Sequence, residues 1–401
     1  MKTYEGLLER LARSNEAGML LAVIDGLGDL PMEELGGRTP LEAARTPNLD
    51  GLALRGALGM HVPVAPGITP GSGPAHLGLF GYDPVEYRVG RGVLAALGVG
   101  FPLEQGDLAA RINFCTVDAD GTVVDRRAGR ISTDRCRELV NLLREITVDG
   151  VEIHLMPVKQ HRACVVFRGE GLTEEPNDTD PGLVGEKPLP INGYGRSGEV
   201  ARKFLKAAAE ILRNQHPANY ILLRGFALYK EFPSMARRFL LKPAAVALYP
   251  MYRGVARLVG MDVLESSPEN LEGQAETVAR AVSEGYDYVF VHHKPADSAG
   301  EDGDHEAKVR AIEEFDAALP RFLENDFSVV VVTGDHSTPC SMKLHSWHPV
   351  PVLFSGEPLR RGYSSAFSER EALKGAMGTF HSVDIIGLMM AVAGKLSKFG
   401  A

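Results

Sequence analysis

The chain has 401 residues, of which 44% are hydrophobic and 24% are charged, and its formal net charge is −9 at pH 7. This length favours two domains, or one domain with a large insertion, and the composition is typical of a soluble globular protein. The acidic balance argues against nucleic-acid binding, which usually needs a basic surface. We therefore expect no nucleic-acid partner. No run reaches the roughly 18 apolar residues of a membrane span, so we also expect no membrane partner.

The beginning of the sequence and the cysteines predict the compartment. "MKTYEGLLERLARSNEAG" carries acidic and basic residues in helical alternation, which argues against a secretion signal. The four cysteines lie far apart and form no CxxC pair, so we expect free thiols and neither a disulfide framework nor a zinc ribbon. Both features predict a cytoplasmic protein.

Apolar strand patterns alternate with amphipathic helical patterns toward both ends of the chain. "GMLLAVID" predicts a buried strand that ends in Asp25, and "TPNLDGLALRG" predicts a helix with a cap at Thr46 and a stop at Gly56. Further strands are predicted at 286–294, 328–336 and 350–354, and further helices at about 268–285, 304–324 and 382–394. This alternation predicts the α/β class, with a mostly parallel sheet flanked by helices on both faces.

A glycine-rich stretch, "GITPGSGPAHLGLFGYDP" at 67–84, places Ser72 between two glycines and shortly before Pro74. One interpretation is a capped helix after a tight turn, because serine and proline are favoured where helices begin. The other is a nucleophile held on that turn, with its hydroxyl at the positive end of the helix. The stretch alone leaves both interpretations open.

The middle of the chain has a different pattern. Two-sided strand patterns such as "EIHLMPV" and "ACVVFRG" are accompanied by helix candidates at 134–146 and 198–215. The polar segment "EGLTEEPNDTDPGLVGEKPLPINGYG" predicts a long surface loop. We therefore predict an inserted α+β domain over residues 108–240, and a discontinuous core made of residues 1–107 and 241–401.

Acidic residues and histidines follow several of the predicted strands, where open α/β sheets place their functional sites. These residues are Asp25, Asp297, Asp335, His336, His345 and His348. Adjacent residues of a strand point to opposite faces, so Asp335 and His336 can serve one site only from a loop, which Gly334 permits. Carboxylates and imidazoles together suit divalent Mn, Zn, Mg, Fe or Co, and the pattern therefore predicts a metal site.

Six separated motifs carry a resemblance to a known family. They are "DGLGD", "RTPLEAARTPNLDGLA", "PGSGPAHLGLFGYDP", "GRGVLAALGVG", "TGDHSTP" and "HSWHPVPVLF". In order and spacing they resemble the cofactor-independent phosphoglycerate mutases of the archaeal-type branch, within the alkaline phosphatase superfamily. "DRRAGRI" and "MYRGVARLVGM" extend the resemblance through the middle of the chain. The resemblance implies an alkaline-phosphatase-like core with an inserted substrate-binding domain.

The resemblance also implies a nucleophile and two metal sites. Ser72 matches the nucleophilic serine of the family, which favours the second interpretation of its turn. One metal site would use Asp25, Ser72, Asp335 and His336. The other would use Asp297, His345 and the residue four positions after Asp297.

That residue is normally histidine in the family pattern, whereas it is Glu301 in this chain. A carboxylate is a harder ligand and adds negative charge, so the metal preference is open. His305 is an alternative ligand, although its spacing of eight from Asp297 fits less well. His348 is expected to be structural or to contact a metal ligand.

A phosphorylated small-molecule substrate needs basic partners, and arginine suits both carboxylate and phosphate. The candidates are Arg126, Arg127, Arg130, His161, Arg162 and Arg224 in the predicted insertion, and Arg253 and Lys294 beside the metal segments. Each arginine taken singly could equally be a solvated surface residue. Asp125 could be an ion-pair partner or a general base for substrate hydroxyls.

The implied enzyme is an isomerase that interconverts 3-phosphoglycerate and 2-phosphoglycerate through a phosphoserine. The inserted domain would close over the core and exclude water, because hydrolysis would make the enzyme a phosphatase. The implied cofactors are two divalent ions, with Mn²⁺ expected first and Mg²⁺, Co²⁺ or Zn²⁺ as alternatives, and no 2,3-bisphosphoglycerate. We expect a monomer or a small homo-oligomer.

Several alternatives remain open at the level of the sequence. One is a phosphatase or phosphomutase of the same superfamily that acts on another phosphate ester. A sulfatase is disfavoured because His76 stands where that pattern has arginine. A catalytically silent homologue is suggested only by Glu301.

Overall fold

The computed structural model describes residues 6–400, and these form two compact units. The first contains the chain up to Arg88, Pro233–Tyr252 and the chain from Val259 onward, and the second contains Val89–Phe232 and Arg253–Leu258. The second unit begins before residue 108 because helix α5 (Arg91–Gly98) packs on its strands. The domain bounds at 108 and 240 stay a prediction.

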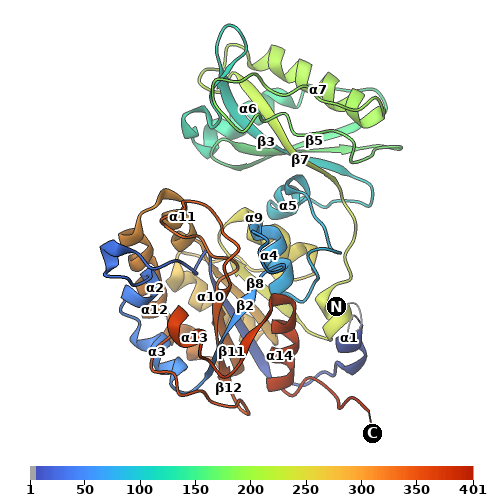
Figure 1. Ribbon diagram of the computed structural model, residues 1–401. Helices are drawn as coiled ribbons and strands as arrows, with labels where there is room; N and C mark the ends of the chain where they lie inside the picture. The colour runs from blue at the N-terminus through green and yellow to red at the C-terminus, as the bar shows by residue number, and fades with distance from the viewer. Residues whose placement is uncertain (1–5, 401) are drawn as a thin grey trace. The chain divides into compact units, whose positions relative to one another are not determined.

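Eight strands of the described chain form the sheet of the first unit, in the order β13-β2-β12-β11-β1-β10-β8-β9 (Figure 1). They are β13 (Gly378–His381), β2 (Ala57–Val62), β12 (Val350–Gly356), β11 (Phe327–Thr333), β1 (Gly18–Ile24), β10 (Tyr288–His293), β8 (Pro243–Ala247) and β9 (Asp262–Val263). β1 lies parallel to both β11 and β10, whereas β12 is antiparallel to β11 and β2. The four strands predicted toward the two ends of the chain are confirmed as β1, β10, β11 and β12.

The centre of this sheet is buried on both faces. All six residues of β10 are buried, and so are the six residues of β1 after its first. Central parallel strands have near-continuous apolar runs for this reason, and "MLLAVI" and "VVVV" are such runs. Helices α3 (Pro47–Ala53), α10 (Leu271–Ser283) and α12 (His305–Leu323) cover one face and α14 (Ile385–Val392) covers the other (Figure 1). The predicted α/β class with a mostly parallel, helix-flanked sheet is confirmed.

The remaining helices of the described chain have these bounds. In the first unit they are α1 (Leu7–Leu11), η2 (Glu33–Leu35), α2 (Pro40–Ala43), α3 (Pro47–Ala53), α4 (Ser72–Leu79), α8 (Met235–Phe239), α10 (Leu271–Ser283), α11 (Pro295–Asp302), α12 (His305–Leu323), α13 (Glu369–Ala372), η4 (Ser382–Asp384) and α14 (Ile385–Val392). Helix α9 (Pro250–Leu258) has residues in both units. No helix within residues 6–400 is long and apolar enough to span a membrane.

The second unit is built on an antiparallel sheet. Its strands are β3 (Leu108–Val117), β4 (Val123–Asp125), β5 (Glu152–Lys159), β6 (Arg162–Arg168) and β7 (Tyr220–Leu228), and its helices are α5, η3 (Ala128–Arg130), α6 (Thr133–Leu143) and α7 (Arg196–Leu212). β3 lies between β6 and β7, and the apolar residues of α6 and α7 pack with it in one core. The predicted strands at "EIHLMPV" and "ACVVFRG" and both predicted helices are confirmed.

The four cysteines are free, as the sequence predicts, and the structure shows that they are also buried. Burial raises the pKa of the Cys136 thiol to about 11 and that of Cys340 to about 12. These thiols are therefore protonated at neutral pH and act as small apolar side chains.

Candidate active site

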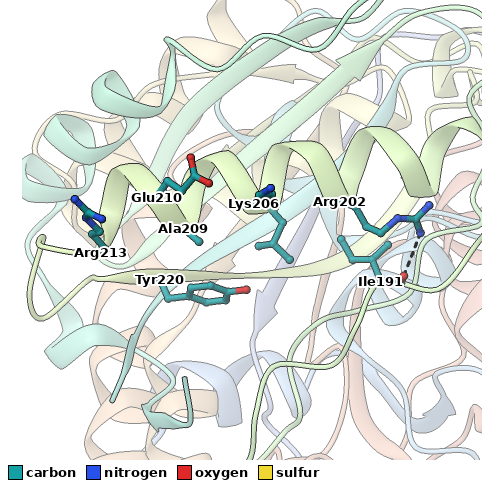
Figure 2. A pocket seen from close by; sticks show the side chains of 8 residues that line it. Ile191, Arg202, Lys206, Ala209, Glu210, Arg213 and Tyr220 are labelled. Carbon is teal, nitrogen blue, oxygen red and sulfur yellow. Dashed lines mark hydrogen bonds between the residues drawn. The ribbon is translucent and has the colours of Figure 1, made fainter. Parts of the chain in front are cut away.

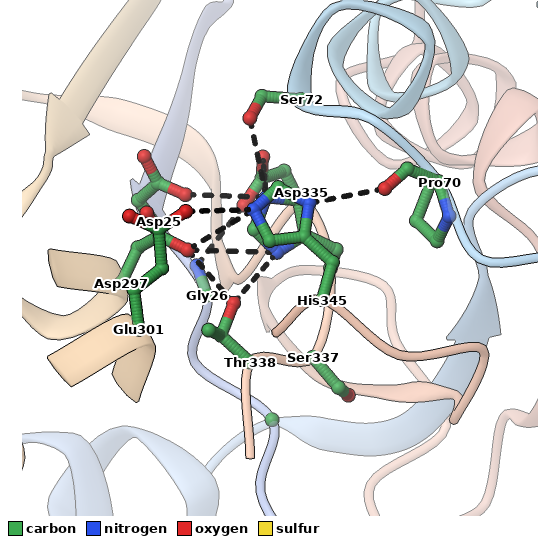
Figure 3. A network of polar contacts seen from close by, with 12 residues as sticks. Asp25, Gly26, Pro70, Ser72, Asp297, Glu301, Asp335, Ser337, Thr338 and His345 are labelled. Carbon is green, nitrogen blue, oxygen red and sulfur yellow. Dashed lines mark hydrogen bonds and ion pairs between the residues drawn. The ribbon is translucent and has the colours of Figure 1, made fainter. Parts of the chain in front are cut away.

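Three neighbouring strands bring acidic residues and histidines to one edge of the first unit's sheet. β1, β10 and β11 are parallel, so the residues that follow them meet at the same edge. Asp335 and His336 lie in the loop after β11, as predicted. Figure 3 shows the side chains of Asp25 and Asp335 converging with those of α4 and α11. The close approach needs Gly26, because a Cβ there would lie 2.8 Å from the Cβ of Asp297.

The first cluster consists of Asp25, Asp335 and His336, all of them buried. Nε2 of His336 lies 3.1 Å from Oδ2 of Asp335 and 3.5 Å from Oδ1 of Asp25. Oδ1 of Asp25 is a buried atom without a hydrogen-bond partner in the described residues. Leaving a buried carboxylate oxygen unpaired is costly unless a cation binds there. The donor set of two carboxylates and one imidazole fits a divalent metal.

Ser72 is the first residue of α4 and its hydroxyl lies 3.3 Å from Nε2 of His336. Gly71 is the N-cap in extended conformation, and no side chain caps this helix. The interpretation of Ser72 as a capping residue is therefore wrong, because its hydroxyl reaches the acidic cluster and does not cap the helix.

The second cluster consists of Asp297, His336 and His345. Nδ1 of His345 lies 3.0 Å from the carbonyl oxygen of Pro70, which can only accept, so Nδ1 carries the proton and Nε2 is available. Nε2 lies 3.5 Å from Oδ1 of Asp297 and 3.8 Å from Oε1 of Glu301. Glu301 is not a member of the cluster, and its side chain is 56% exposed. The Glu301 carboxylate therefore lies at the exposed edge of the second cluster, next to His345.

Two other histidines considered from the sequence join neither cluster within residues 6–400. His305 is the first residue of α12. His348 contacts the hydroxyl of Ser346 and stacks on Trp347. The structure gives His348 a packing role, in agreement with the structural alternative.

The charges in the first cluster are strongly coupled. Burial alone would raise the pKa of Asp25, but Lys294 and His292 outweigh it and hold that pKa well below its ordinary value. Burial and the charge of Asp25 raise the pKa of Asp335 to about 6. Burial lowers the pKa of His336, which keeps the imidazole neutral and able to bind a metal. A bound divalent cation would favour the ionised form of both carboxyls.

Several residues at this edge were not predicted from the sequence. Tyr252 donates a short hydrogen bond to Asp25 and stacks on His292, whose Nε2 lies 3.3 Å from Oδ2 of Asp25. His76 donates from Nδ1 to the carbonyl oxygen of Ser72 at 2.8 Å and lies 3.3 Å from Oδ2 of Asp335. No local pattern separates these side chains from ordinary core residues, because their partners are distant in sequence.

The two basic residues predicted beside the metal segments have different positions. Lys294 bridges the carboxylates of Asp25 and Asp297, with 3.1 Å from Nζ to Oδ2 of Asp25 and a short contact to Asp297. Arg253 belongs to the second unit. Lys294 thus contacts one carboxylate of each cluster in the first unit.

The remaining basic candidates gather in the second unit. His161 is buried, and burial together with the charges of Arg162, Arg127, Arg111 and Arg130 lowers its pKa to about 4. The low pKa of His161 therefore reflects burial together with the positive charges of four arginines. Arg111 is the member of this group that sequence reasoning missed.

Arg126 and Arg224 are held by a carboxylate of the same unit. Arg126 forms a bidentate pair with Asp180, with both N–O distances 2.9 Å. Nη1 of Arg224 lies 3.1 Å from Oδ2 of the same Asp180. Both arginines are therefore fixed by ion pairs, whereas Arg127 and Arg130 are exposed and have no side-chain hydrogen bond or ion pair within residues 6–400.

Asp125 shapes the turn that carries these arginines. Its two carboxylate oxygens accept the backbone N–H groups of Arg127 and Gly129, at 2.7 and 2.6 Å. Residues 128–130 all have positive φ, including Ala128 at 47° and Arg130 at 53°. Such strain is usually held in place by surrounding contacts and is enriched at functional sites. The structure thus gives Asp125 a third role, that of organising the turn.

The second unit also has an open pocket of about 490 Å³ beside α7 (Figure 2). It is lined by Ile191, Arg202, Leu205, Lys206, Ala209, Glu210, Arg213 and Tyr220. Arg202 donates to the carbonyl oxygen of Ile191 at 3.2 Å. None of the predicted site residues lines this pocket, and we assign it no role.

Comparison with known proteins identifies the family. A family model described as 2,3-bisphosphoglycerate-independent phosphoglycerate mutase matches residues 53–219. A probable 2,3-bisphosphoglycerate-independent phosphoglycerate mutase of Aquifex aeolicus is 48% identical over 98% of this chain and 100% of its own length. This chain belongs to that family.

Solved structures agree with this membership. A protein from Pyrococcus horikoshii is 33% identical, with a TM-score of 0.84 over 96% of this chain and 99% of its own. A cofactor-independent phosphoglycerate mutase from Thermoplasma acidophilum is 32% identical, with a TM-score of 0.70 over 94% of this chain and 100% of its own. The alternatives left open by the sequence are thereby decided in favour of a phosphoglycerate mutase.

Proposed function

We propose that this phosphoglycerate mutase interconverts 3-phosphoglycerate and 2-phosphoglycerate through a phosphoserine at Ser72. One observation carries the proposal. The Ser72 hydroxyl does not cap its helix and lies 3.3 Å from a buried imidazole of the acidic cluster. The start of α4 adds backbone N–H groups and a positive dipole end, which favour a phosphoryl group.

The residues at the sheet edge suit two divalent metal ions. One ion would be held by Asp25, Ser72, Asp335 and His336, and the other by Asp297, Glu301 and His345. Such ions lower the pKa of a serine hydroxyl and neutralise phosphoryl oxygens. Mn²⁺ is the first expectation, with Mg²⁺, Co²⁺ or Zn²⁺ as alternatives. The carboxylate of Glu301 makes the second site richer in oxygen, which favours Mg²⁺ and Mn²⁺ relative to softer ions.

The proposed reaction consists of two phosphoryl transfers. In the first, Oγ of Ser72 forms a bond to phosphorus, the ester bond of the substrate breaks, and the serine proton is lost while the glycerate oxygen gains one. In the second, the other glycerate hydroxyl forms its bond to phosphorus, the Oγ–P bond breaks, and Ser72 regains a proton. Glycerate has to stay bound and reorient between the two transfers.

The arginines of the second unit are proposed to bind substrate anions. Within residues 6–400, Arg127 and Arg130 are exposed and have no side-chain ion pair, so their guanidinium groups can donate to a carboxylate or phosphate without breaking one. Arg126, Arg162, Arg224, His161 and Arg253 are proposed to support them, and Lys294 to contact the phosphoryl group.

Product analysis tests the proposal directly. Purified protein is incubated with Mn²⁺ and 3-phosphoglycerate, free of 2,3-bisphosphoglycerate, and products are identified by ³¹P NMR. We expect 2-phosphoglycerate, loss of activity with a chelator, and no added cofactor requirement. Free phosphate as the main product, or an absolute need for 2,3-bisphosphoglycerate, would count against the proposal.

A further inference from the structure

The hydroxyl of Thr338 contacts two members of the second cluster at the sheet edge (Figure 3). Its Oγ1 is 2.8 Å from Oδ1 of Asp297 and 3.0 Å from Nδ1 of His336. Thr338 is itself fully buried. His336 is the residue that both clusters share, so the contact with Thr338 bears on which cluster receives its imidazole.

The single proton of the threonine hydroxyl decides the direction of both hydrogen bonds. The carboxylate of Asp297 can only accept, so the hydroxyl donates to it. Toward His336 the same oxygen can then only accept, which requires the proton of the neutral ring to be on Nδ1. Nε2 keeps its lone pair, and this atom is the one near Asp25, Asp335 and Ser72.

A buried lysine holds the backbone of Thr338 in place. Nζ of Lys308 donates to the carbonyl oxygens of Thr338 and Gly28, at 2.9 and 3.2 Å, and to Oδ2 of Asp29 at 2.8 Å. All three ammonium protons therefore have partners, and Lys308 is fully buried. Asp29 also accepts the backbone N–H of Cys340 at 3.1 Å.

Close packing also restricts the hydroxyl itself. The backbone N–H of Thr338 donates to the carbonyl oxygen of Gly28 at 3.0 Å. A Cβ on Gly26 would lie 2.7 Å from Oγ1 of Thr338. The loop after β1 and the loop after β11 are thus tied together around this hydroxyl.

We propose that Thr338 is a positioning residue that fixes the tautomer of His336 and so assigns its Nε2 to the ion beside Ser72. The second ion is then left with Asp297, His345 and the carboxylate of Glu301. This inference rests on the proposed two-metal function. Hydrogen-bond partners that orient a metal-binding histidine typically change metal affinity by roughly 10- to 100-fold.

The test uses two pairs of full-length proteins that differ by the hydroxyl alone. Thr338→Val is compared with the natural protein, and Thr338→Ala with Thr338→Ser. Metal affinity and stoichiometry are measured by calorimetric titration with Mn²⁺. The His336 tautomer is measured by long-range ¹H–¹⁵N NMR on ¹⁵N-histidine protein without metal, because a metal on Nε2 would by itself leave the proton on Nδ1. The Ala and Ser pair keeps the test decisive if the Val variant does not fold.

We expect the hydroxyl-free variants to bind one Mn²⁺ roughly 10- to 100-fold more weakly and to lose the signature of a protonated Nδ1. Thr338→Ser should stay within about threefold of the natural protein. Equal affinities and the same tautomer with and without the hydroxyl would overturn the inference alone. A natural protein that binds no Mn²⁺ would overturn the proposed function and this inference with it.

Discussion

The charged side chains that gather in the two units of the molecule have opposite signs. In the first, the carboxylates of Asp25, Asp335 and Asp297 lie near the neutral imidazole of His336, and Lys294 contacts two of them. In the second, the charges of four arginines act on one buried histidine, His161, and add to burial in lowering its pKa. The proposed phosphorylated substrate and divalent ions carry charges that complement those of the two units.

The pKa values of two buried histidines reflect this difference in charge. His76 lies beside Asp335, and although burial lowers its pKa, the charge of that carboxylate outweighs burial and raises the pKa overall. His161 lies among arginines, so burial and their charges act in the same direction and lower its pKa to about 4. The comparison favours the proposal that the chemistry belongs to the first unit and anion recognition to the second. The predictions below test this division.

Ser72→Ala should have the largest effect. Removing the nucleophile should lower mutase activity by about 10³-fold or more while the fold is kept. Activity is measured with 3-phosphoglycerate and Mn²⁺, and the fold by circular dichroism. Ser283→Ala, an exposed serine of the same unit, is the matched control. More than about a tenth of the natural rate in Ser72→Ala would exclude Ser72 as the phosphoryl acceptor.

Glu301 tests whether the first unit holds its second ion through an oxygen ligand. Glu301→Ala should lower bound metal from about two ions toward one and reduce activity at least about tenfold. Glu301→His should keep two ions and shift the preference toward Co²⁺ or Zn²⁺. Metal analysis and metal-titrated activity measure both effects.

The neighbouring Asp302→Ala is the control, since it removes an exposed carboxylate of the same helix. Unchanged stoichiometry and rate in Glu301→Ala would mean that Glu301 is a solvated surface carboxylate.

The sequence predicted those parts of the site that depend on local pattern. Asp25 could be found because a buried apolar run ends at it. The loop position of Asp335 and His336 followed from the alternation of side chains along a strand. Parallel strands bring such ends to one edge, so the cluster was predictable without knowing any distance.

Other parts of the site depend on contacts between distant segments. Ser72 was ambiguous because capping and nucleophile turns share the same local residues. Lys308 and Thr338 gain their roles only through each other and the loop after β1. Asp125 was interpreted by charge, whereas its carboxylate serves the backbone of a strained turn.

The exposed arginines of the second unit should affect substrate binding and leave metal binding unchanged. Arg127→Met and Arg130→Met should each raise the KM for 3-phosphoglycerate roughly 10- to 100-fold, since a charge-assisted hydrogen bond is lost. Metal stoichiometry should stay at the natural value. Arg137→Met is the control, because Arg137 is exposed in the same unit and pairs with Asp134. An unchanged KM in both variants would contradict the proposed division of roles between the units.

The smallest expected effect concerns the pH dependence of His161. Its pKa is about 4 in the folded protein and about 6.5 when unfolded, so between these values only the unfolded state binds the proton. The contribution of His161 to the free energy of unfolding is therefore fully present above about pH 6.5 and is lost as the pH falls toward 4.

His161→Gln removes the titration, and the natural protein should lose about 1 to 2 kcal/mol more stability than the variant between pH 6.5 and 4.5. Urea unfolding at several pH values measures this difference, with the exposed His216→Gln as control. Because the arginine charges add to burial in lowering this pKa, NMR titration in Arg162→Met should give a higher pKa for His161. A His161 pKa near 6.5 in the natural protein would show that the arginine cluster does not act on it.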